Sequence, residues 1–297
     1  MRKILNFGSL NIDYVYEVPH FVRAGETLAA TGYNVFCGGK GLNQSIALSR
    51  AGAKVYHAGV VGQGSELLIK TLEKNNVDTL FIREHAGASG HAIIQRDLFG
   101  QNSILIYNGA NHCISNSDVE KVLSHFSADD FIVLQNEINM VDTIIKKAKK
   151  KDMKVFFNPS PMVDDIRTFP FGLVDVLLLN EVEGSDMSGQ SEPAKILNVL
   201  SCMYPQSAII LTLGEQGVLY IDHSLEKPLS HIAYSVKVAD TTAAGDTFCG
   251  YFIARLAAGD KIEEILRIAS VASSISVSRH GAEPSIPYLD EVLNKGF

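Results

Sequence analysis

Short apolar runs alternate with amphipathic helical segments over the second half of the chain, and this alternation limits the possible folds more than any other feature. The runs lie at 131–134, 155–157, 176–179 and 208–213, and helical patterns lie between them at about 140–151 and 192–203. Continuous apolar strands that alternate with helices are typical of a parallel sheet covered by helices on both faces. We therefore predict a three-layer α/β/α fold with a mostly parallel central sheet.

Two other stretches, at about 11–35 and 91–108, are rich in β-forming residues and are not followed by helices. The second has a turn-forming segment at 97–102 between two apolar runs, which indicates a β-hairpin. No flexible linker divides the 297 residues. We expect one domain over 1–297 with a small β-sheet lid, and an exposed face on that lid favours a homodimer.

Composition excludes several classes of function. The net charge is −7, and the one basic run, 146–151, comes at the end of a helical pattern, where cations complement the helix dipole. Nucleic-acid binding therefore has little electrostatic support. The four cysteines form no C-x-x-C pair, so no zinc site is expected and free thiols suit a reducing compartment. No apolar stretch approaches about 20 residues, so we expect a cytoplasmic protein without a membrane partner.

The segment 236–250 carries the strongest indication of chemistry. A short strand leads into a turn of small residues, Ala243, Ala244 and Gly245, which opens a helix whose first turn contains Asp246. Free N–H groups and the helix dipole make such a helix start an anion site suited to a phosphoryl group. An acidic residue in a first helical turn is common in its own right, so this segment alone does not decide the function.

A second glycine-rich turn, 38–44, precedes a predicted helix at 43–51. It is not a P-loop, because Asn34 stands where the first glycine is required and Gly41 replaces the Ser or Thr. The segment 8–13 after the first strand lacks the G-x-G-x-x-G pattern of a dinucleotide-binding enzyme. Polar residues follow four predicted strands, at 137, 158, 180 and 212. Ligands of open parallel sheets bind at that edge, so we expect one shared crevice.

Six motifs in order, at 11–13, 38–44, 180–183, 212–217, 240–250 and 281–285, resemble those of the PfkB family of sugar kinases, most closely its ribokinase-like branch. The resemblance covers essentially the whole chain. It implies a ribokinase-like fold and transfer of the γ-phosphoryl group of ATP, with Mg²⁺, to a sugar hydroxyl. The implied substrate is D-ribose and the implied product is D-ribose 5-phosphate.

The resemblance also implies a role for particular residues. Asp246 would be the base, and the N–H groups of Ala243, Ala244, Gly245 and Asp246 would hold the phosphoryl group. The sugar would contact Asn11, Asp13, Gly39, Lys40, Asn43, Glu137 and Asp246. ATP would contact Asn180, Thr212, Gly214, Gly217 and Gly245, with Glu183 near Mg²⁺ but not as a direct ligand. A monovalent cation, usually K⁺, would lie among Asp240, Thr242, Ser276, Arg279, Gly281 and Ser285.

Other readings of these motifs stay open. Lys40 is the one cation among the predicted sugar contacts, which favours an uncharged sugar, but another neutral sugar or a nucleoside fits as well. A non-catalytic sugar or nucleotide sensor on the same fold is a further alternative, since a fold does not grant activity. The segment 95–99 is more charged and bulky than expected for this lid, and Ser270 stands where a polar adenine contact is common in relatives.

Overall fold

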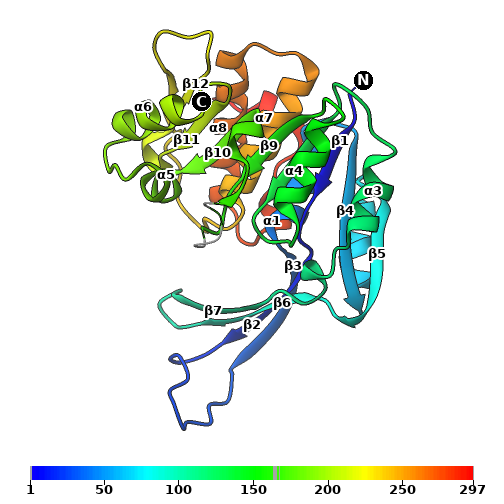
Figure 1. The fold of residues 1–297 in the computed structure, drawn as a ribbon. Coiled ribbons are helices and arrows are strands. Elements are labelled where there is room, and N and C mark those ends of the chain that lie inside the picture. The colour runs from blue at the N-terminus through cyan, green and yellow to red at the C-terminus, as the bar shows by residue number, and fades with distance from the viewer. Residues whose placement is uncertain (1, 163–165, 167, 297) are drawn as a thin grey trace.

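The apolar runs at 131–134, 155–157, 176–179 and 208–213 form four neighbouring parallel strands, as predicted. They belong to the large sheet of the computed structural model, which describes residues 2–162, 166 and 168–296 (Figure 1). The strand order of this sheet is β13-β12-β11-β10-β9-β8-β1-β4-β5. Its pairings are parallel except for those of β12 and β13 at one edge. In chain order the strands are β1 (Ile4–Phe7), β4 (Val55–Gln63), β5 (Asp78–Ala88), β8 (Phe131–Gln135), β9 (Lys154–Asn158), β10 (Val176–Asn180), β11 (Ala208–Thr212), β12 (Val218–Ile221) and β13 (Leu229–His231).

Helices cover both faces of this sheet, so the expected α/β/α architecture is confirmed (Figure 1). One apolar core lies between the sheet and α1, α2, α7, α8 and α9, and the other lies between the sheet and α3, α4 and α6. The helices are α1 (Lys40–Arg50), α2 (Glu66–Lys74), α3 (Asn116–Leu123), α4 (Val141–Lys149), α5 (Glu181–Ser188), α6 (Pro193–Met203), α7 (Ala244–Ala258), α8 (Ile262–Val277) and α9 (Leu289–Leu293).

A small sheet projects from the edge of the large sheet where the strands end (Figure 1). Its order is β3 (Gly32–Gly38), β2 (Asn11–Glu17), β6 (Gly90–Arg96) and β7 (Asn102–Tyr107). The hairpin predicted around 97–102 is the antiparallel pair β6–β7. The chain enters the small sheet directly from β1 and β5 and leaves it directly into α1. The segments 8–11, 38–40 and 88–90 therefore form the junction between the two sheets.

Two helix starts differ from the prediction, and each difference has a physical cause. The first helix begins at Lys40 rather than 43, because the Lys40 N–H donates to Glu137 Oε2 at 2.9 Å and a carboxylate from a distant strand end caps the helix. Asp260, with Glu263 three residues on, has the pattern of a capping box and predicts a helix start at Asp260, but α8 begins at Ile262 without a side-chain cap. The Asp260 carboxylate accepts a hydrogen bond from Arg255 Nε at 2.7 Å instead.

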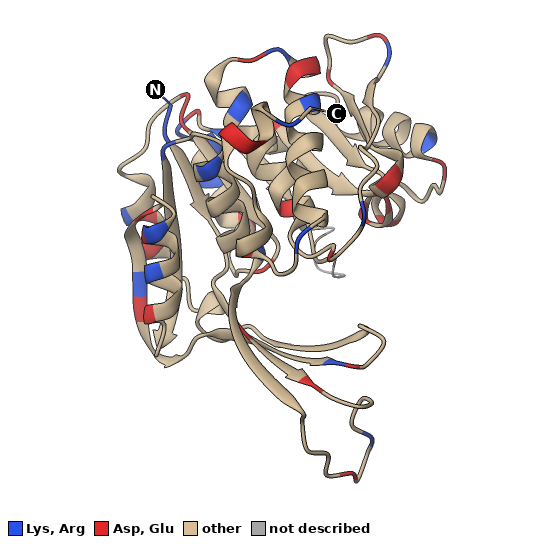
Figure 2. Cartoon of the chain, turned by 180° about the vertical axis from the view of Figure 1, so that it is seen from behind, with Lys and Arg blue, Asp and Glu red and all other residues tan. Residues whose placement is uncertain are grey.

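Lys and Arg residues are interspersed with Asp and Glu residues over the large sheet and its helices, whereas the small sheet carries few charges (Figure 2). Three lysines of the basic run 146–151 pair with carboxylates: Lys146 with Asp142, Lys147 with Glu120 and Lys149 with Asp175. Among the residues placed in the structure, no helix combines the length and hydropathy needed to cross a bilayer.

Candidate active site

The start of α7 has the geometry of an anion-binding site. Ala243 adopts a left-handed conformation with φ 60° and is the N-cap, and its carbonyl accepts the Thr247 N–H at 2.8 Å. The N–H groups of Gly245 and Asp246 precede this first helical bond and are directed out of the helix start. The Ala244 N–H differs, since it donates to the Thr241 carbonyl at 3.3 Å. Of the four N–H groups predicted to hold a phosphoryl group, that of Ala244 is thus already engaged, whereas those of Gly245 and Asp246 are directed out of the helix start.

The Asp246 carboxylate is buried and held by two amides from α1. Asn43 Nδ2 donates to Asp246 Oδ2 and Gln44 Nε2 donates to Asp246 Oδ1, each at 3.0 Å. The helices approach closely because Gly250, one turn after Asp246, has no side chain: a Cβ there would lie 2.4 Å from Ala47 Cβ. Asn43 Oδ1 is buried and has no hydrogen-bond partner among the described residues, so it is available to a ligand hydroxyl.

Glu137 and Lys40 lie beside this carboxylate. Glu137 Oε2 accepts hydrogen bonds from Ser9 Oγ and from the Lys40 N–H. Burial raises the pKa of Glu137 and outweighs the opposing effect of the Lys40 ammonium. Burial by itself lowers the pKa of Lys40. The nearby carboxylates of Asp246, Glu137 and Glu183 outweigh this effect, so the net shift of the Lys40 pKa is upward. The site thus concentrates negative charge around one lysine.

Asp13 and Asn11 reach this region from β2. Asp13 packs against Gly38, where an added Cβ would lie 2.1 Å from Asp13 Oδ2. Burial, and secondly the charge of Glu137, raise the pKa of Asp13 to about 7. Asn11 Oδ1 accepts from Asn111 Nδ2 at 2.7 Å, which fixes the Asn11 amide at the junction of the sheets.

A cavity of about 500 Å³ begins at the same helix start. The predicted nucleotide contacts Thr212, Gly214, Gly217 and Gly245 all line it, and so does Ser270. Its other walls include the rings of Tyr234 and Phe248 and the side chains of Val236, Val238 and Val277. Gly245 lines this cavity, and the next residue, Asp246, contacts Asn43. The start of α7 therefore lies between an aromatic and aliphatic cavity and the polar, acidic side chains around Asp246.

Asn180 and Glu183 form a capping box at the start of α5, rather than lining the cavity. Asn180 Oδ1 accepts the Glu183 N–H at 2.8 Å and Glu183 Oε2 accepts the Asn180 N–H at 3.0 Å. Glu183 is buried and close enough to Lys40 to raise its pKa. One oxygen of the Glu183 carboxylate is thus occupied by the cap.

The residues predicted to hold a monovalent cation form two hydrogen-bonded groups around the end of α8. Asp240 accepts from the N–H and Oγ1 of Thr242 and from the Gly281 N–H at 3.0 Å. Ser276 Oγ and Ser285 Oγ are fully buried and 2.8 Å apart. The Arg279 N–H donates to the Ser276 carbonyl, whereas the Arg279 side chain pairs with Glu291. The side chains of both groups are thus already hydrogen-bonded to protein partners.

Arg50 at the end of α1 holds this C-terminal loop in place. Its guanidinium donates to the carbonyls of Glu283 and Ile286, to the Glu283 carboxylate and to Asn75 Oδ1. We expect Arg50→Met to lower the free energy of unfolding by about 3 kcal/mol, because it leaves the largely buried Glu283 carboxylate without its cationic partner. Urea denaturation measures this, with Arg267→Met, which removes an exposed pair with Glu264, as the control. Equal unfolding midpoints for the two variants would contradict the expectation.

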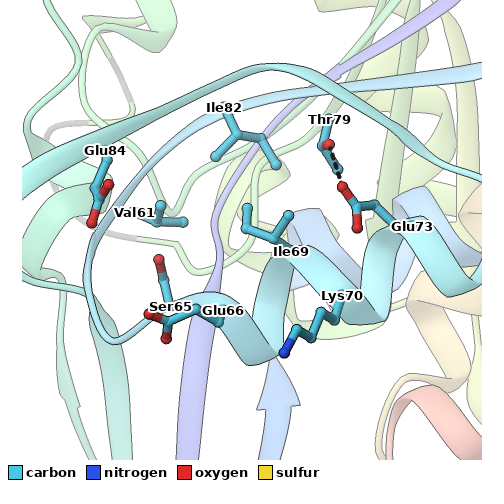
Figure 3. Close-up of a pocket in the computed structure, with 9 residues that line it drawn as sticks. All are labelled: Val61, Ser65, Glu66, Ile69, Lys70, Glu73, Thr79, Ile82 and Glu84. Carbon is cyan, nitrogen blue, oxygen red and sulfur yellow. Dashed lines mark hydrogen bonds between the residues drawn. The ribbon is translucent and has the colours of Figure 1, made fainter.

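A second hollow lies between α2 and the strands β4 and β5 (Figure 3). Three carboxylates, Glu66, Glu73 and Glu84, line it with Lys70, and Glu73 accepts a hydrogen bond from Thr79 Oγ1 at 3.3 Å. None of the residues predicted from the sequence to bind a ligand belongs to this hollow.

The predicted sugar residues and the α7 start come together, but the sequence did not assign roles to Gln44, Asn111 or Ser9. Gln44 lies inside the glycine-rich motif, but adjacent residues of a helix point about 100° apart. The motif therefore did not predict that Gln44 and Asn43 would both contact Asp246. Asn111 is 100 residues from Asn11 and belongs to the one-turn helix Gly109–His112, for which no sequence signal was found.

A helix start that can hold a phosphoryl group, beside a carboxylate that can orient a hydroxyl, defines the class of enzymes that transfer a phosphoryl group to an alcohol.

The comparisons with known proteins agree with this class. The chain belongs to the pfkB family of carbohydrate kinases, whose profile matches residues 1–289, and it is therefore a phosphotransferase with an alcohol acceptor. It is 32% identical to a ribokinase of Haemophilus influenzae over 99% of this chain and 98% of the relative. Its fold is similar to a ribokinase of Cryptococcus neoformans in complex with ADP (TM-score 0.87, 31% identity, 99% of each chain). A similar match is an Arabidopsis thaliana ribokinase complexed with ribose and ATP (TM-score 0.87, 27% identity, 98% of this chain and 97% of that one).

Proposed function

We propose that the chain transfers the γ-phosphoryl group of ATP to the 5-hydroxyl of D-ribose. The observation that carries this proposal is the contact between Asn43 and Asp246, because it joins the polar residues of α1 to the helix start that borders the cavity. The relatives described as ribokinases support the choice of sugar. The acidic character of the polar half, with Asp13 and Glu137 near a single lysine, favours a neutral polyol over a sugar phosphate.

In the proposed reaction, ribose binds between Asp13, Asn11, Gly39, Lys40, Asn43 and Glu137. Asp246 accepts a hydrogen bond from the reacting hydroxyl and takes its proton as the new bond to phosphorus forms. A carboxylate is a weak base for an alcohol, so the proton moves late, in a loose transition state. The N–H groups of Gly245 and Asp246 stabilise the charge on the transferred group.

Two ions complete the proposed site. Mg²⁺ would neutralise charge on the ATP phosphates, and Glu183 would meet it through water, because Mg²⁺ usually keeps several of its waters. A monovalent cation such as K⁺ would be held by carbonyls of the loop 276–285 near Asp240, Thr242, Ser276, Arg279, Gly281 and Ser285. Replacing K⁺ by Na⁺ at constant ionic strength tests the second ion, with a lower kcat expected in Na⁺.

The small sheet supports two further parts of the proposal. It stands at the edge of the polar site, where it can serve as a lid (Figure 1). Apolar side chains are exposed on it, notably Ile93, Ile104, Leu105, Ile106 and Tyr107. Exposed apolar surface of this extent favours a homodimer through the lid. Sedimentation velocity of the intact chain measures the oligomeric state.

A panel of acceptors tests the proposed substrate. With Mg-ATP, ADP release is measured for D-ribose, 2-deoxy-D-ribose, D-fructose and adenosine, and the phosphorylated position is read by NMR. We expect D-ribose to have the highest kcat/KM and its product to carry phosphate at O5. A higher kcat/KM for another acceptor would replace ribose by that acceptor. Ligand binding without ADP release for every acceptor would favour a sensor over a kinase.

The raised pKa of Asp13 predicts the pH dependence of sugar use. Protonated Asp13 loses capacity to accept hydroxyl hydrogen bonds, so kcat/KM for ribose should fall as pH drops below about 7, by roughly tenfold per unit. Asp13→Asn, which cannot ionise, should have a low kcat/KM without this acidic limb. The pH profile of kcat/KM checks this. If Asp13→Asn shows the same fall in kcat/KM at low pH as the natural chain, another group causes that fall.

The raised pKa of Asp13 also makes the stability of the folded protein depend on pH. The native pKa of Asp13 lies above the value of 3.8 for an unperturbed Asp, so the native state binds more protons between pH 4 and 7. This carboxyl therefore stabilises the protein at low pH, and its contribution is lost as pH rises through about 7. Urea midpoints measured across this window should fall less steeply for Asp13→Asn than for the natural chain.

A further inference from the structure

A chain of buried side chains leads from the candidate base into the core beneath the polar site. Its members are each at most 1% exposed, and in order from the base they are Gln44, Gln135, Asn6, Ser45 and His57. They come from α1, β8, β1 and β4, so the chain joins one helix to three neighbouring strands of the large sheet. The proposed reaction uses none of these five residues.

Continuous hydrogen bonds link the members. Gln44 Nε2 donates to Asp246 Oδ1 at 3.0 Å. Gln135 Nε2 donates to Gln44 Oε1 at 2.7 Å and to Asn6 Oδ1 at 2.9 Å, so both of its hydrogens are used. Asn6 Nδ2 donates to Ser45 Oγ at 2.8 Å, and Ser45 Oγ lies 2.8 Å from His57 Nδ1.

Backbone carbonyls at the far end fix the direction of every bond. His57 Nε2 lies 3.3 Å from the Gly8 carbonyl, which can only accept, so this nitrogen carries the hydrogen. Burial lowers the pKa of His57 to about 4, so the ring is neutral at pH 7 and Nδ1 accepts from Ser45. The Gly41 carbonyl accepts from Asn6 Nδ2 at 2.7 Å and independently fixes the Asn6 amide. The amide orientations that refinement commonly leaves ambiguous are thus determined here.

The direction of these hydrogen bonds leaves one buried oxygen atom without a partner. Gln135 Oε1 is buried without a hydrogen-bond partner among the described residues, and it lies against Gly8, where an added Cβ would be 2.4 Å away. Turning the Gln135 amide over would place its oxygen against the oxygens of Gln44 and Asn6. The Gln44 amide would then have to turn too and present its oxygen to the Asp246 carboxylate. One buried oxygen without a hydrogen-bond partner costs less free energy than two pairs of acceptor oxygens that face each other.

We propose that Gln44 is a positioning residue for Asp246, and that the buried chain from Gln135 to His57 keeps the Gln44 amide turned so that its N–H faces the carboxylate. This inference rests on the proposed function, in which Asp246 orients the sugar hydroxyl. With one oxygen held by Gln44 and the other by Asn43, the Asp246 carboxylate has a single orientation when the sugar arrives. Such preorganisation acts on kcat more than on nucleotide binding.

The test compares variants that keep or remove the N–H groups of this chain. Gln44→Met and Gln135→Met remove the donors without adding charge, and Gln135→Glu keeps the shape of Gln135 but has at most one donor in place of two. For Gln44→Met we expect kcat with the best acceptor to fall about 100-fold, the effect of roughly 1 Å of misplacement. For Gln135→Met we expect about tenfold, and more for Gln135→Glu, while the KM for ATP stays within about twofold.

Three further variants separate positioning from general loss of packing. His57→Gln can still accept from Ser45 and donate to the Gly8 carbonyl, so it should retain more of kcat than His57→Leu. Ser207→Ala is the control, because Ser207 is also a buried polar residue but its side chain donates to the Val174 carbonyl, outside this chain. It should lower the unfolding midpoint without changing kcat.

The outcomes distinguish this inference from the proposed function. If the natural chain phosphorylates no acceptor, the proposed function fails before any variant is compared. If the natural chain is active and folded Gln44→Met and Gln135→Met keep its kcat, the positioning role is wrong and the kinase assignment stands. A fall in kcat that is equal for Ser207→Ala and Gln135→Met at equal loss of stability would also overturn the positioning role.

Discussion

Asp246→Asn should lower kcat by about 1,000-fold, within the range that general bases contribute, while leaving ATP binding intact. The amide of Asn cannot take the proton of the sugar hydroxyl. It also cannot accept from both partners, because its own NH₂ group would face the N–H of either Asn43 or Gln44. The chemical step should therefore lose both its proton acceptor and the alignment of the hydroxyl.

Steady-state and single-turnover kinetics with ribose and Mg-ATP measure the loss, and calorimetry with a non-hydrolysable ATP analogue measures nucleotide affinity. Asp260→Asn is the control, since Asp260 is an acidic residue beyond the other end of α7 that accepts from Arg255. Its kcat should stay close to that of the natural chain. A folded Asp246→Asn with kcat within tenfold of the natural value would remove Asp246 as the base.

Much of the fold was predictable because its signals are local. Continuous apolar runs mark buried parallel strands wherever they occur, and the four runs from 131 to 213 are β8 to β11. The small-residue turn before Asp246 likewise indicated the start of α7 within one residue. These features depend on neighbours in the chain, so spacing alone carries them.

What could not be predicted depends on contacts between distant residues. The first turn of α1 begins early because Glu137, 97 positions away, caps it. The contact of Gln44 with Asp246 requires α7 to cross α1 at a particular distance, and no pattern within either helix states that distance. The roles of the candidate site residues remain predictions, because they concern ligands and a reaction, whereas the structure gives the arrangement of the side chains alone.

The crossing of α1 and α7 gives the second large expected effect. Gly250→Ala would place a Cβ 2.4 Å from Ala47 Cβ and 2.8 Å from the Leu48 backbone nitrogen, so one helix must move. Overpacking of this kind costs about 1–3 kcal/mol. Alanine gains back about 1 kcal/mol of helix propensity, so the net loss of stability should be small. The effect on activity should be much larger, because the movement separates Asp246 from Asn43 and Gln44.

We therefore expect Gly250→Ala to fold and bind ATP but to lose about 100-fold in kcat/KM for the sugar, the effect of roughly 1 Å of displacement. Gly172→Ala is the control, because a Cβ at Gly172 meets no atom within 4 Å. Ala47→Gly combined with Gly250→Ala removes the tightest contact but leaves backbone contacts at 2.8 and 2.9 Å, so it should restore activity in part. If Gly250→Ala keeps the natural kcat/KM, close helix packing does not set the position of Asp246. If the double variant is no better than Gly250→Ala, the backbone contacts alone hold the helices apart.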